Sequence, residues 1–320
     1  MVYRFPFPAF PIGWFRVAKS SDVRPGQLKS IHYFGRNLVL WRSGEGTVRL
    51  FDSHCSHLGA DVGQGAVVEN MIQCPFHGWR FDAEGVCAWI PGDQKIPPKA
   101  KLGAWPVHEA NGQVMVYFHP DGESPTWTFP TFLEASDPAW SGFHEGPGLP
   151  RIRTHVQEVM ENGVDLRHIE YLHSKAVVSA DSIDVQVEGP ILIHRTVQTY
   201  NTFGLAKKFV GGAIRGPLEF QMVGLGAALT RATLDVGFEI RYSFLFFSTP
   251  IDAEHVEFNS MMSVKKFRSR AATHLLLKKA MREGKSIGNW SGHAGSHARP
   301  SASMTRVSKV ARPCLAAVDR

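Results

Sequence analysis

The sequence predicts two domains, a small all-β domain followed by a larger α+β domain. Three observations predict this fold class. The chain of 320 residues is longer than one ordinary hydrophobic core requires, and 43% of it is hydrophobic. Short apolar or alternating segments, separated by Gly, Asp and Asn, fill its first third. Longer apolar segments with helical segments between them follow, which is the pattern of an α+β domain.

The first domain is predicted over residues 1–125. Its expected strands are short segments that alternate or run apolar, at 37–42, 47–52, 71–76, 79–87 and 113–118. The segment HPDGESPTWTFP, at 119–130, gathers Pro, Gly and Asp and predicts the boundary between the domains.

The second domain is predicted over residues 126–283. Segments 151–163 and 191–204 are predicted as strands, with a helical segment at 161–174 between them. Two long strands are predicted next, at 232–250 and 254–264, joined at the sequence TPIDAE. A helix that ends at a glycine is predicted over 270–284.

The charge is unevenly distributed along the chain. Residues 265–320 contain 13 basic and 2 acidic residues, whereas residues 1–264 contain 22 basic and 27 acidic ones. The net charge of +6 therefore comes from the tail alone. Aromatic residues are not interleaved with these charges as a nucleic-acid surface would require, so we expect no nucleic acid partner.

The N-terminal segment MVYRFPFPAFPIGWF is interrupted by prolines and aromatic residues and does not resemble a secretory leader. The longest weakly polar stretch, FQMVGLGAALT, is far shorter than the roughly 20 residues of a transmembrane helix. Four cysteines, Cys55, Cys74, Cys87 and Cys314, are too few and too unevenly spread for a disulfide framework. We expect a cytoplasmic protein without an integral membrane segment.

Two pairs of metal-binding residue types lie close together in the first domain. Cys55-x-His57 and, sixteen residues further on, Cys74-x-x-His77 supply two thiolates and two imidazoles from two loops. This set could form a structural Cys2His2 zinc site, and the spacing does not distinguish zinc from an iron–sulfur cluster. Cys87 has no paired ligand nearby and is expected to be a buried thiol.

The sequences around the two loops favour the cluster. SHLGA and CPFHGW are rich in Gly or Pro, which suits backbone amides turned toward bridging sulfides, and no recognition helix follows as in a zinc finger. With the following RFDAEGVC, the segment resembles the Rieske [2Fe-2S] motif. That resemblance implies that Cys55 and Cys74 bind one iron, and His57 and His77 the other. Neutral histidine ligands raise the reduction potential of such a cluster, which passes on single electrons.

A second group of chemically active residues lies at 161–173, ENGVDLRHIEYLH. Taken alone, this segment fits an amphipathic helix with surface His and Glu. Beside a Rieske motif, it resembles the Asn-x-x-Asp-x-x-His-x-x-x-x-His pattern of Rieske non-haem iron oxygenases, with Asn162, Asp165, His168 and His173 in register.

The resemblance implies a helix-grip catalytic domain in which His168 and His173 bind a mononuclear Fe(II) together with one downstream carboxylate. Such a facial arrangement leaves positions for O2. It further implies that Asp165 connects the iron-binding histidine to His57 or His77 of the neighbouring subunit, in a homotrimer, and that Asn162 belongs to the same catalytic segment.

Helix geometry adds a condition to this interpretation. Five residues at 100° each place His168 and His173 about 140° apart on an ideal helix, too far for two ligands of one ion. A π-type turn or a break between them is therefore expected. Asp165 and His168, three residues apart, do share a face.

The third ligand is the weakest point of the resemblance. Glu283 is the only acid near the expected place, and Asp235 and Glu239 are the alternatives. Residues 284–320 are basic, rich in Ser, Ala, Arg and Gly, and without apolar periodicity, which predicts a disordered tail. Such a composition also arises when a GC-rich reading frame is shifted, in which case the third ligand would be lost.

The resemblance covers residues 12 to about 264 and is strongest to the ketosteroid 9α-hydroxylase and cholesterol 7-desaturase branch. It implies a terminal oxygenase that uses O2 to hydroxylate or desaturate a hydrophobic ring substrate such as a sterol or steroid. The electrons would come from NADH or NADPH through a flavin/iron–sulfur reductase or ferredoxin. The alternatives are an oxygenase acting on aromatic compounds, an electron-transfer protein, and a catalytically defective Rieske protein.

Overall fold

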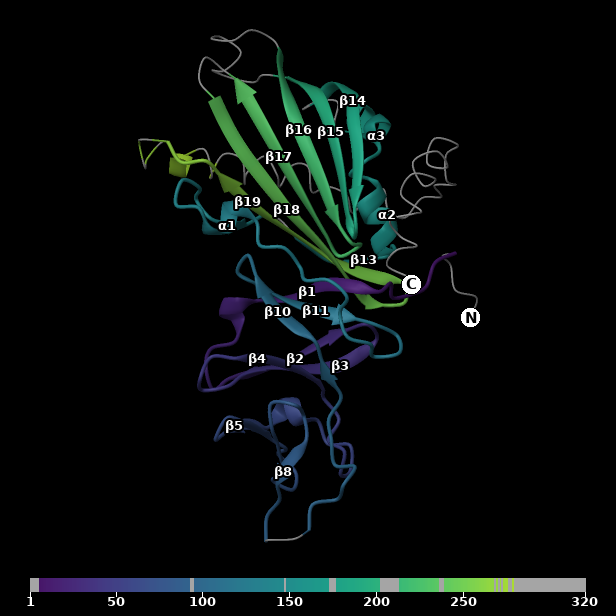
Figure 1. Cartoon of the computed structure of the whole chain (residues 1–320), viewed down its shortest axis with the longest axis vertical. Coiled ribbons are helices and arrows are strands. Elements are labelled where there is room, and N and C mark those ends of the chain that lie inside the picture. Colours follow the sequence, from purple (N-terminus) through teal and green to yellow (C-terminus); the bar gives the residue numbers. More distant parts are fainter. Residues whose placement is uncertain are drawn as a thin grey trace. The chain divides into compact units, whose positions relative to one another are not determined.

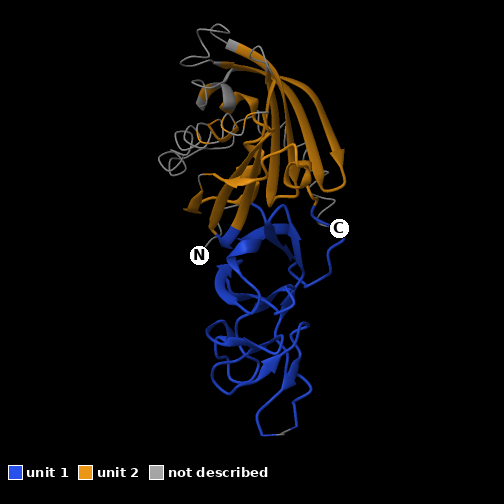
Figure 2. Cartoon of the chain, turned by 90° about the vertical axis from the view of Figure 1, so that its left-hand side faces the viewer, with its two compact units in different colours: residues 1–129, 250–253 blue, residues 130–249, 254–320 orange. Residues whose placement is uncertain are grey.

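The computed structural model describes residues 6–92, 95–146, 148–172, 177–201, 213–235, 239–267, 269, 271, 273–275 and 278 (Figure 1). The chain divides into two compact units (Figure 2). Unit 1 consists of residues 1–129 with 250–253, and unit 2 consists of residues 130–249 with 254–320.

Unit 1 is built from short antiparallel strands in three sheets, which confirms the predicted all-β class. One sheet has the order β1-β11-β10, the second β2-β3-β4-β9 and the third β5-β6-β7-β8. The strands are β1 (Gly13–Lys19), β2 (Leu28–Tyr33), β3 (Arg36–Arg42), β4 (Val48–Asp52), β5 (Ala66–Val68), β6 (Met71–Gln73), β7 (Arg80–Phe81), β8 (Cys87–Trp89), β9 (Ala104–Trp105), β10 (Val107–Ala110) and β11 (Gln113–Phe118).

Aromatic side chains fill the core of unit 1. Phe34 is 2% exposed and stacks on Trp105 and Phe118, with ring centroids 5.5 and 5.0 Å apart. A second cluster packs Trp41 and Phe51 in the same group of buried side chains as Cys55 and Cys74. The cysteine-bearing loops therefore rest on a rigid hydrophobic base.

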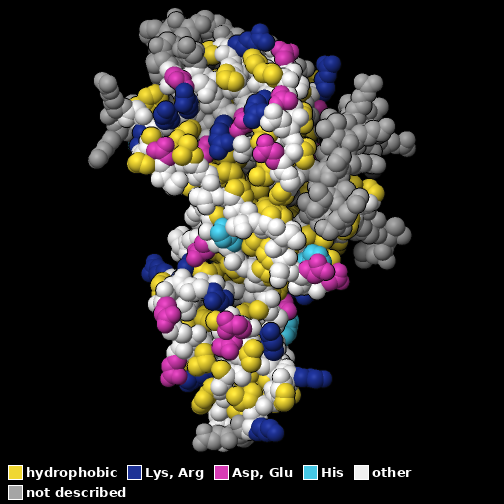
Figure 3. Space-filling model, viewed as in Figure 1, with side chains coloured by type: hydrophobic (Ala, Val, Ile, Leu, Met, Phe, Trp, Pro, Cys, Tyr) yellow, Lys and Arg dark blue, Asp and Glu magenta, His cyan; other side chains and the backbone are white. Residues whose placement is uncertain are grey.

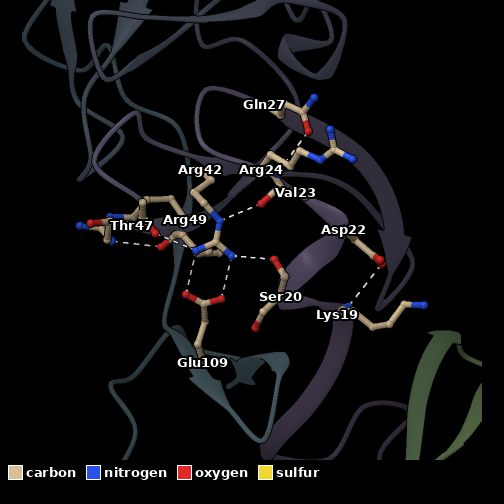
Figure 4. Close-up of polar contacts among 12 residues, drawn as sticks. Lys19, Ser20, Asp22, Val23, Arg24, Gln27, Arg42, Thr47, Arg49 and Glu109 are labelled. Carbon is tan, nitrogen blue, oxygen red and sulfur yellow. Dashed lines mark hydrogen bonds and ion pairs between the residues drawn. The ribbon is translucent and has the colours of Figure 1, made fainter. Parts of the chain in front are cut away.

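An ion pair between buried Arg42 and the more exposed Glu109 joins two sheets of unit 1. The guanidinium of Arg42, at the end of β3, donates to both carboxylate oxygens of Glu109 on β10, at 2.7 and 3.0 Å. It also donates to the backbone oxygens of Ser20 and Val23, at 2.9 and 2.7 Å (Figure 4). Burial alone would raise the pKa of Glu109, but the hydrogen bonds from Arg42 and Ser20 outweigh it and hold that pKa below its usual value.

Unit 2 is an antiparallel eight-stranded sheet with short helices, which confirms the predicted α+β class (Figure 1). Its main order is β12-β19-β18-β17-β16-β15-β14, and β13 pairs with β19. The elements are α1 (Leu133–Ser136), β12 (His144–Glu145), β13 (Leu149–Ile152), α2 (Val156–Glu161), α3 (Leu166–Leu172), β14 (Val177–Glu188), β15 (Ile191–Asn201), β16 (Ala213–Val223), β17 (Ala227–Asp235), β18 (Glu239–Asp252) and β19 (His255–Val264).

Two expectations for unit 2 were wrong in detail. Segment 151–163, expected as a strand, ends its strand at Ile152 and forms α2 from Val156. His155 starts this helix, because its Nδ1 accepts a hydrogen bond from the backbone of Gln157. Segment 232–250, expected as one strand, instead contributes to β17 and β18, which pair as antiparallel neighbours.

The strands expected at 191–204 and 254–264 are present as β15 and β19, with residues 202–204 outside the described residues. The expectations for the C-terminal part lie largely outside the described residues. Of the helix predicted at 270–284, the described positions 271, 273–275 and 278 are helical. The tail at 284–320 is not described. No helix in the described part of the chain is both long and apolar enough to cross a bilayer.

Candidate metal centres

The same pattern of backbone hydrogen bonds closes both Cys-His loops of unit 1. In the first, the Cys55 amide donates to Ala60 O and the Gly59 amide to Cys55 O, both at 2.8 Å. In the second, the Cys74 amide donates to Trp79 O at 2.8 Å and the Gly78 amide to Cys74 O at 3.1 Å. Each glycine stands four residues after its cysteine with φ near +75°, at +77° and +72°, a conformation that favours glycine.

The four candidate ligands divide into a buried pair and an exposed pair. Cys55 and Cys74 are 4% and 1% exposed, and both are free thiols. The imidazole rings of His57 and His77 are exposed and lie 4.6 Å apart between centroids. Burial, and then the neighbouring Cys74, raise the pKa of Cys55 to about 11. Two such thiols become thiolates together only when a cation compensates their charge.

This division fits a two-iron cluster better than a zinc ion. A Cys2His2 zinc ion needs all four side chains around one point. A [2Fe-2S] cluster asks for only two protein ligands at each iron, with the cysteines at one and the histidines at the other. The donor set of this site meets that requirement.

The surroundings of the histidines include residues that sequence reasoning did not single out. The indole of Trp79 stacks flat on His57, with centroids 4.3 Å apart and planes 7° from parallel. Phe76 contacts His77 and is 64% exposed, and Leu58 is 67% exposed. Their adjacency to ligands in the sequence was the available signal. Cys87 is 3% exposed and its Sγ points to Trp89 O at 3.6 Å, which confirms the expected buried thiol.

The second motif begins α3 in unit 2. Oδ1 of Asp165 accepts a hydrogen bond from the Arg167 amide at 3.0 Å, so Asp165 caps the helix. The Nδ1 atom of His168 lies 2.8 Å from Asp165 O. A carbonyl oxygen only accepts, so Nδ1 carries the proton and Nε2 carries the lone pair that could bind a metal. Burial lowers the pKa of His168, despite the opposing effect of Asp165, and so favours the neutral ring that metal binding needs.

The other residues of the second motif are placed as follows. Asn162 ends α2 and donates from Nδ2 to Glu158 O at 3.1 Å. No π-type turn interrupts α3, whose regular helix ends at Leu172. His173 lies just beyond it, outside the described residues, so the expected break stays a prediction.

Of the three candidates for the carboxylate iron ligand, two lie within the described residues. Glu283 lies outside the described residues. Glu239 begins β18, is exposed, and pairs with Arg241. Asp235 ends β17 opposite Glu239 in the strand register. Of His168, His173 and Glu283, only His168 therefore has its side chain and contacts within the described part of unit 2.

Comparison with known proteins agrees with this geometry. Residues 13–103 match the family described as Rieske [2Fe-2S] domain. Residues 116–287, more than half of the chain, match the 3-ketosteroid 9alpha-hydroxylase C-terminal domain. The chain belongs to the Rieske non-haem iron oxygenases. Its first domain is a Rieske [2Fe-2S] domain, and its second is the catalytic domain of this family, whose match includes Glu283.

Curated relatives of this chain are named for sterol and steroid chemistry. Cholesterol 7-desaturase nvd 1 of Ciona intestinalis is 39% identical over 180 residues, which is 56% of this chain and 38% of the relative. The probable 3-ketosteroid-9-alpha-monooxygenase oxygenase component of Rhodococcus rhodochrous is 33% identical over 163 residues, 50% of this chain and 41% of the relative. The matched region thus spans about two fifths of each relative's length.

Solved structures with the same fold cover nearly the whole chain. Dicamba monooxygenase bound to 3,6-dichlorosalicylic acid superposes with a TM-score of 0.73 at 18% identity, over 95% of this chain and 97% of that chain. NdmA of Pseudomonas putida CBB5, as a QL mutant with theobromine, gives a TM-score of 0.68 at 18% identity over 95% and 89%. At this identity the likeness establishes the fold.

Proposed function

We propose that this chain is the terminal oxygenase of a Rieske-type system, which hydroxylates or desaturates a sterol or steroid. The observation that carries the proposal is the coexistence of two donor sets in one chain. One is the buried cysteine pair with its exposed histidine pair, and the other is His168 on α3 with Nδ1 bound to Asp165 O. An electron carrier would need only the first set.

The chemistry requires two centres because it needs two electrons with one O2. Hydroxylation converts a C–H bond, O2, two electrons and two protons into C–OH and water. A Rieske cluster supplies electrons singly, and a mononuclear Fe(II) with open positions supplies the site where O2 is activated.

The chain's own residues would serve these centres in different ways. His57 and His77 place two exposed imidazoles at the surface of the Rieske domain, where an electron can leave it, and Trp79 holds the His57 ring in orientation. Asp165 fixes the tautomer of His168 and starts the helix that carries it. We assign His173 and Glu283 as the remaining iron ligands, and Asn162 as a positioning residue between α2 and α3.

The steroid assignment rests on the curated relatives, which are cholesterol 7-desaturases and a ketosteroid monooxygenase. The solved structures with 3,6-dichlorosalicylic acid, theobromine or caffeine are of proteins that share the fold with this chain at 16–18% identity. We therefore prefer a sterol or steroid to an aromatic acid.

The proposal implies further partners. A flavin/iron–sulfur reductase or a ferredoxin would bring electrons from NADH or NADPH, and the cytoplasm is the compartment in which we place this system. A homotrimer would let each Rieske domain meet the iron of the next subunit through Asp165, because the two motifs lie in separate units of the chain.

Turnover of a substrate panel tests the proposal. The purified protein, reconstituted with iron and sulfide, is incubated in air with NADH, a surrogate reductase, and sterols, 3-ketosteroids or aromatic acids. Mass spectrometry should show a steroid gaining 16 mass units or losing two. Turnover of aromatic acids alone would replace the proposed substrate, and no turnover with both iron centres loaded would overturn the oxygenase function.

A further inference from the structure

The two faces of the catalytic sheet differ sharply in charge. Directly opposed positions on four neighbouring strands, β14 to β17, form one row, Asp184–Arg195–Glu219–Arg231. Consecutive members are ion-paired at 3.2, 3.0 and 3.1 Å. Basic and acidic side chains gather over these strands in the view of Figure 3. All the charges of this row lie on one face.

The opposite face carries no charge at the positions paired in these registers. Side chains alternate along a strand, so the residues next to the ionic row point to the other side. Among the described positions of β14 to β18 that these registers pair, which reach Phe247 on β18, none on this second face holds Asp, Glu, Lys or Arg. Its members include His194, Thr196, Gln198, Phe220, Tyr242 and Phe244.

The uncharged face is the one on which the iron-binding segment packs. A Cβ at Gly163, between α2 and α3, would lie 2.0 Å from the ring of Phe220, so this turn presses against that side chain. Phe220 lies directly opposite His194 in the register of β15 and β16. His168 follows Gly163 by five residues, on α3. The uncharged face is therefore the side of the sheet next to the turn that leads into α3.

Three polar side chains of β15 are buried on that face. Thr196 and Gln198 are 2% exposed and His194 is 4% exposed. Nε2 of His194 lies 3.1 Å from Ser182 Oγ, and burial lowers the pKa of His194, so the ring is neutral at pH 7. In a mostly apolar surface, buried polar groups of this kind require hydrogen-bond partners.

Gln198 and Tyr200 make few hydrogen bonds within the described part of the chain. Nε2 of Gln198 makes a long 3.4 Å contact to Thr196 Oγ1, and no described residue donates to its carbonyl oxygen. The hydroxyl of Tyr200 is buried and makes no hydrogen bond of regular geometry within the described part. Burial, and after it the charge and the hydroxyl group of the neighbouring Tyr242, raise the pKa of Tyr200, so the two phenols interact. An amide and two phenols thus offer donors and acceptors without charge.

We propose that Gln198, Tyr200 and Tyr242 bind an uncharged oxygen of the ring substrate, a hydroxyl or keto group, and so orient it beneath α3. This inference rests on the proposed function and makes its substrate class more specific. A carboxylate substrate would need a cation to compensate the loss of its hydration, and the described positions of this face provide none. The site therefore selects neutral oxygenated steroids over aromatic acids.

Equilibrium binding to the full-length, iron-loaded protein tests the inference independently of turnover. The probes are cholesterol, 5-cholestene, which lacks the 3-hydroxyl group, and dicamba, an aromatic acid. Wild type should bind cholesterol about tenfold more tightly than 5-cholestene, as expected when the oxygen satisfies a buried polar group, and should not bind dicamba measurably.

Two conservative variants test which residues produce the preference for cholesterol over 5-cholestene. Gln198→Met, similar in size but without the amide, and Tyr200→Phe, without the hydroxyl, should each remove most of the preference for cholesterol. Gln221→Met is the matched control, since Gln221 lies on the charged face of β16 and contacts Glu219. It should keep the preference unchanged. Tyr200→Phe changes one buried atom, so it remains informative even if Gln198→Met unfolds.

The outcomes separate the two proposals. If the variants weaken the binding of cholesterol and of 5-cholestene equally, or weaken the binding of neither, the inference is wrong and the steroid oxygenase function stands. Tight dicamba binding would also overturn it. If neither steroid binds to wild type with both iron centres loaded, the proposed function itself fails together with the inference.

Discussion

Oδ1 of Asp165 accepts a hydrogen bond from the backbone amide of Arg167 at 3.0 Å. The same residue offers its carbonyl oxygen to Nδ1 of His168 at 2.8 Å. Asp165 therefore acts locally in two ways, as the cap of α3 and as the group that fixes the histidine tautomer. Only the first of these involves the carboxylate, and an amide side chain can perform it equally well.

Replacing Asp165 by Asn separates the cap from the charge. Asn is as good a helix cap as Asp, so Asp165→Asn should keep the fold, the Rieske cluster and the mononuclear iron. Steady-state turnover should nevertheless fall about ten- to a hundredfold, because the bridging charge is lost. Iron content, circular dichroism and turnover are measured together. Glu158→Gln, on the neighbouring α2, is the control, and wild-type turnover in Asp165→Asn would remove the bridging role.

The carboxylate ligand can be identified by counting iron. An Fe(II) held by two neutral histidines alone keeps its full charge and binds weakly. Glu283→Ala should therefore lose about one iron per chain while the Rieske signal stays constant. Glu239→Ala serves as the matched comparison, since Glu239 is exposed and paired with Arg241. If Glu283→Ala retains its iron and Glu239→Ala loses it, the carboxylate ligand lies on β18 and is not Glu283.

The ion pair between buried Glu134 and Arg231 allows a prediction about the stability of unit 2. Glu134 is 1% exposed and accepts hydrogen bonds from Arg231 at 2.6 and 3.2 Å and from Ser243 Oγ at 2.8 Å. Glu134→Gln should lower the free energy of unfolding at pH 7 by about 2 kcal/mol. Glu239→Gln, at an exposed pair, should change it by less than about 0.5 kcal/mol. Denaturant unfolding followed by circular dichroism measures both.

The loss of unfolding free energy in Glu134→Gln should change with pH in one direction only. Burial alone would raise the pKa of Glu134, but the hydrogen bonds from Arg231 and Ser243 outweigh it and hold the pKa below its usual value. A carboxylate with a lowered folded-state pKa stabilises the protein above its unfolded pKa of about 4.3 and loses that contribution as pH falls through the folded value. The deficit of Glu134→Gln should hence shrink below about pH 4. A deficit that grows in acid would contradict this sign.

Many strands could be predicted because each has an alternating or apolar pattern within its own few residues. Alternation and apolar runs predict 37–42, 47–52 and 113–118, which are β3, β4 and β11 within one residue. Segment 151–163 was predicted wrongly because its β-branched residues have strand propensity. The cap at His155 and the buried Val156 and Met160, four residues apart, instead favour a helix.

The site could be predicted only in part, for a different reason. Ligand types and spacing identify Cys55, His57, Cys74 and His77 as a group, and the two loops indeed approach through their histidine rings. The polar positions His194, Thr196 and Gln198 alternate in the sequence, but the sequence does not say which face of the sheet is covered. That information lies in the register of β15 with its neighbours.

Assembly gives the next prediction. Because the Rieske and iron motifs lie in separate units, closed cyclic symmetry would bring the Rieske domain of one chain to the iron of the next. Analytical ultracentrifugation should show a trimer, and turnover per chain should fall on dilution below its dissociation range. A monomer that turns over at high dilution with undiminished rate would contradict a path across the subunit boundary.

The electron paramagnetic resonance spectrum of the dithionite-reduced protein tests the central claim most directly. Buried Cys55 and Cys74 with exposed His57 and His77 predict the signal of a [2Fe-2S] cluster with mixed cysteine and histidine ligands. His57→Cys should alter or abolish this signal, because it changes the ligand and charge at one iron. A colourless protein that contains zinc, has no iron and gives no such signal would contradict the account.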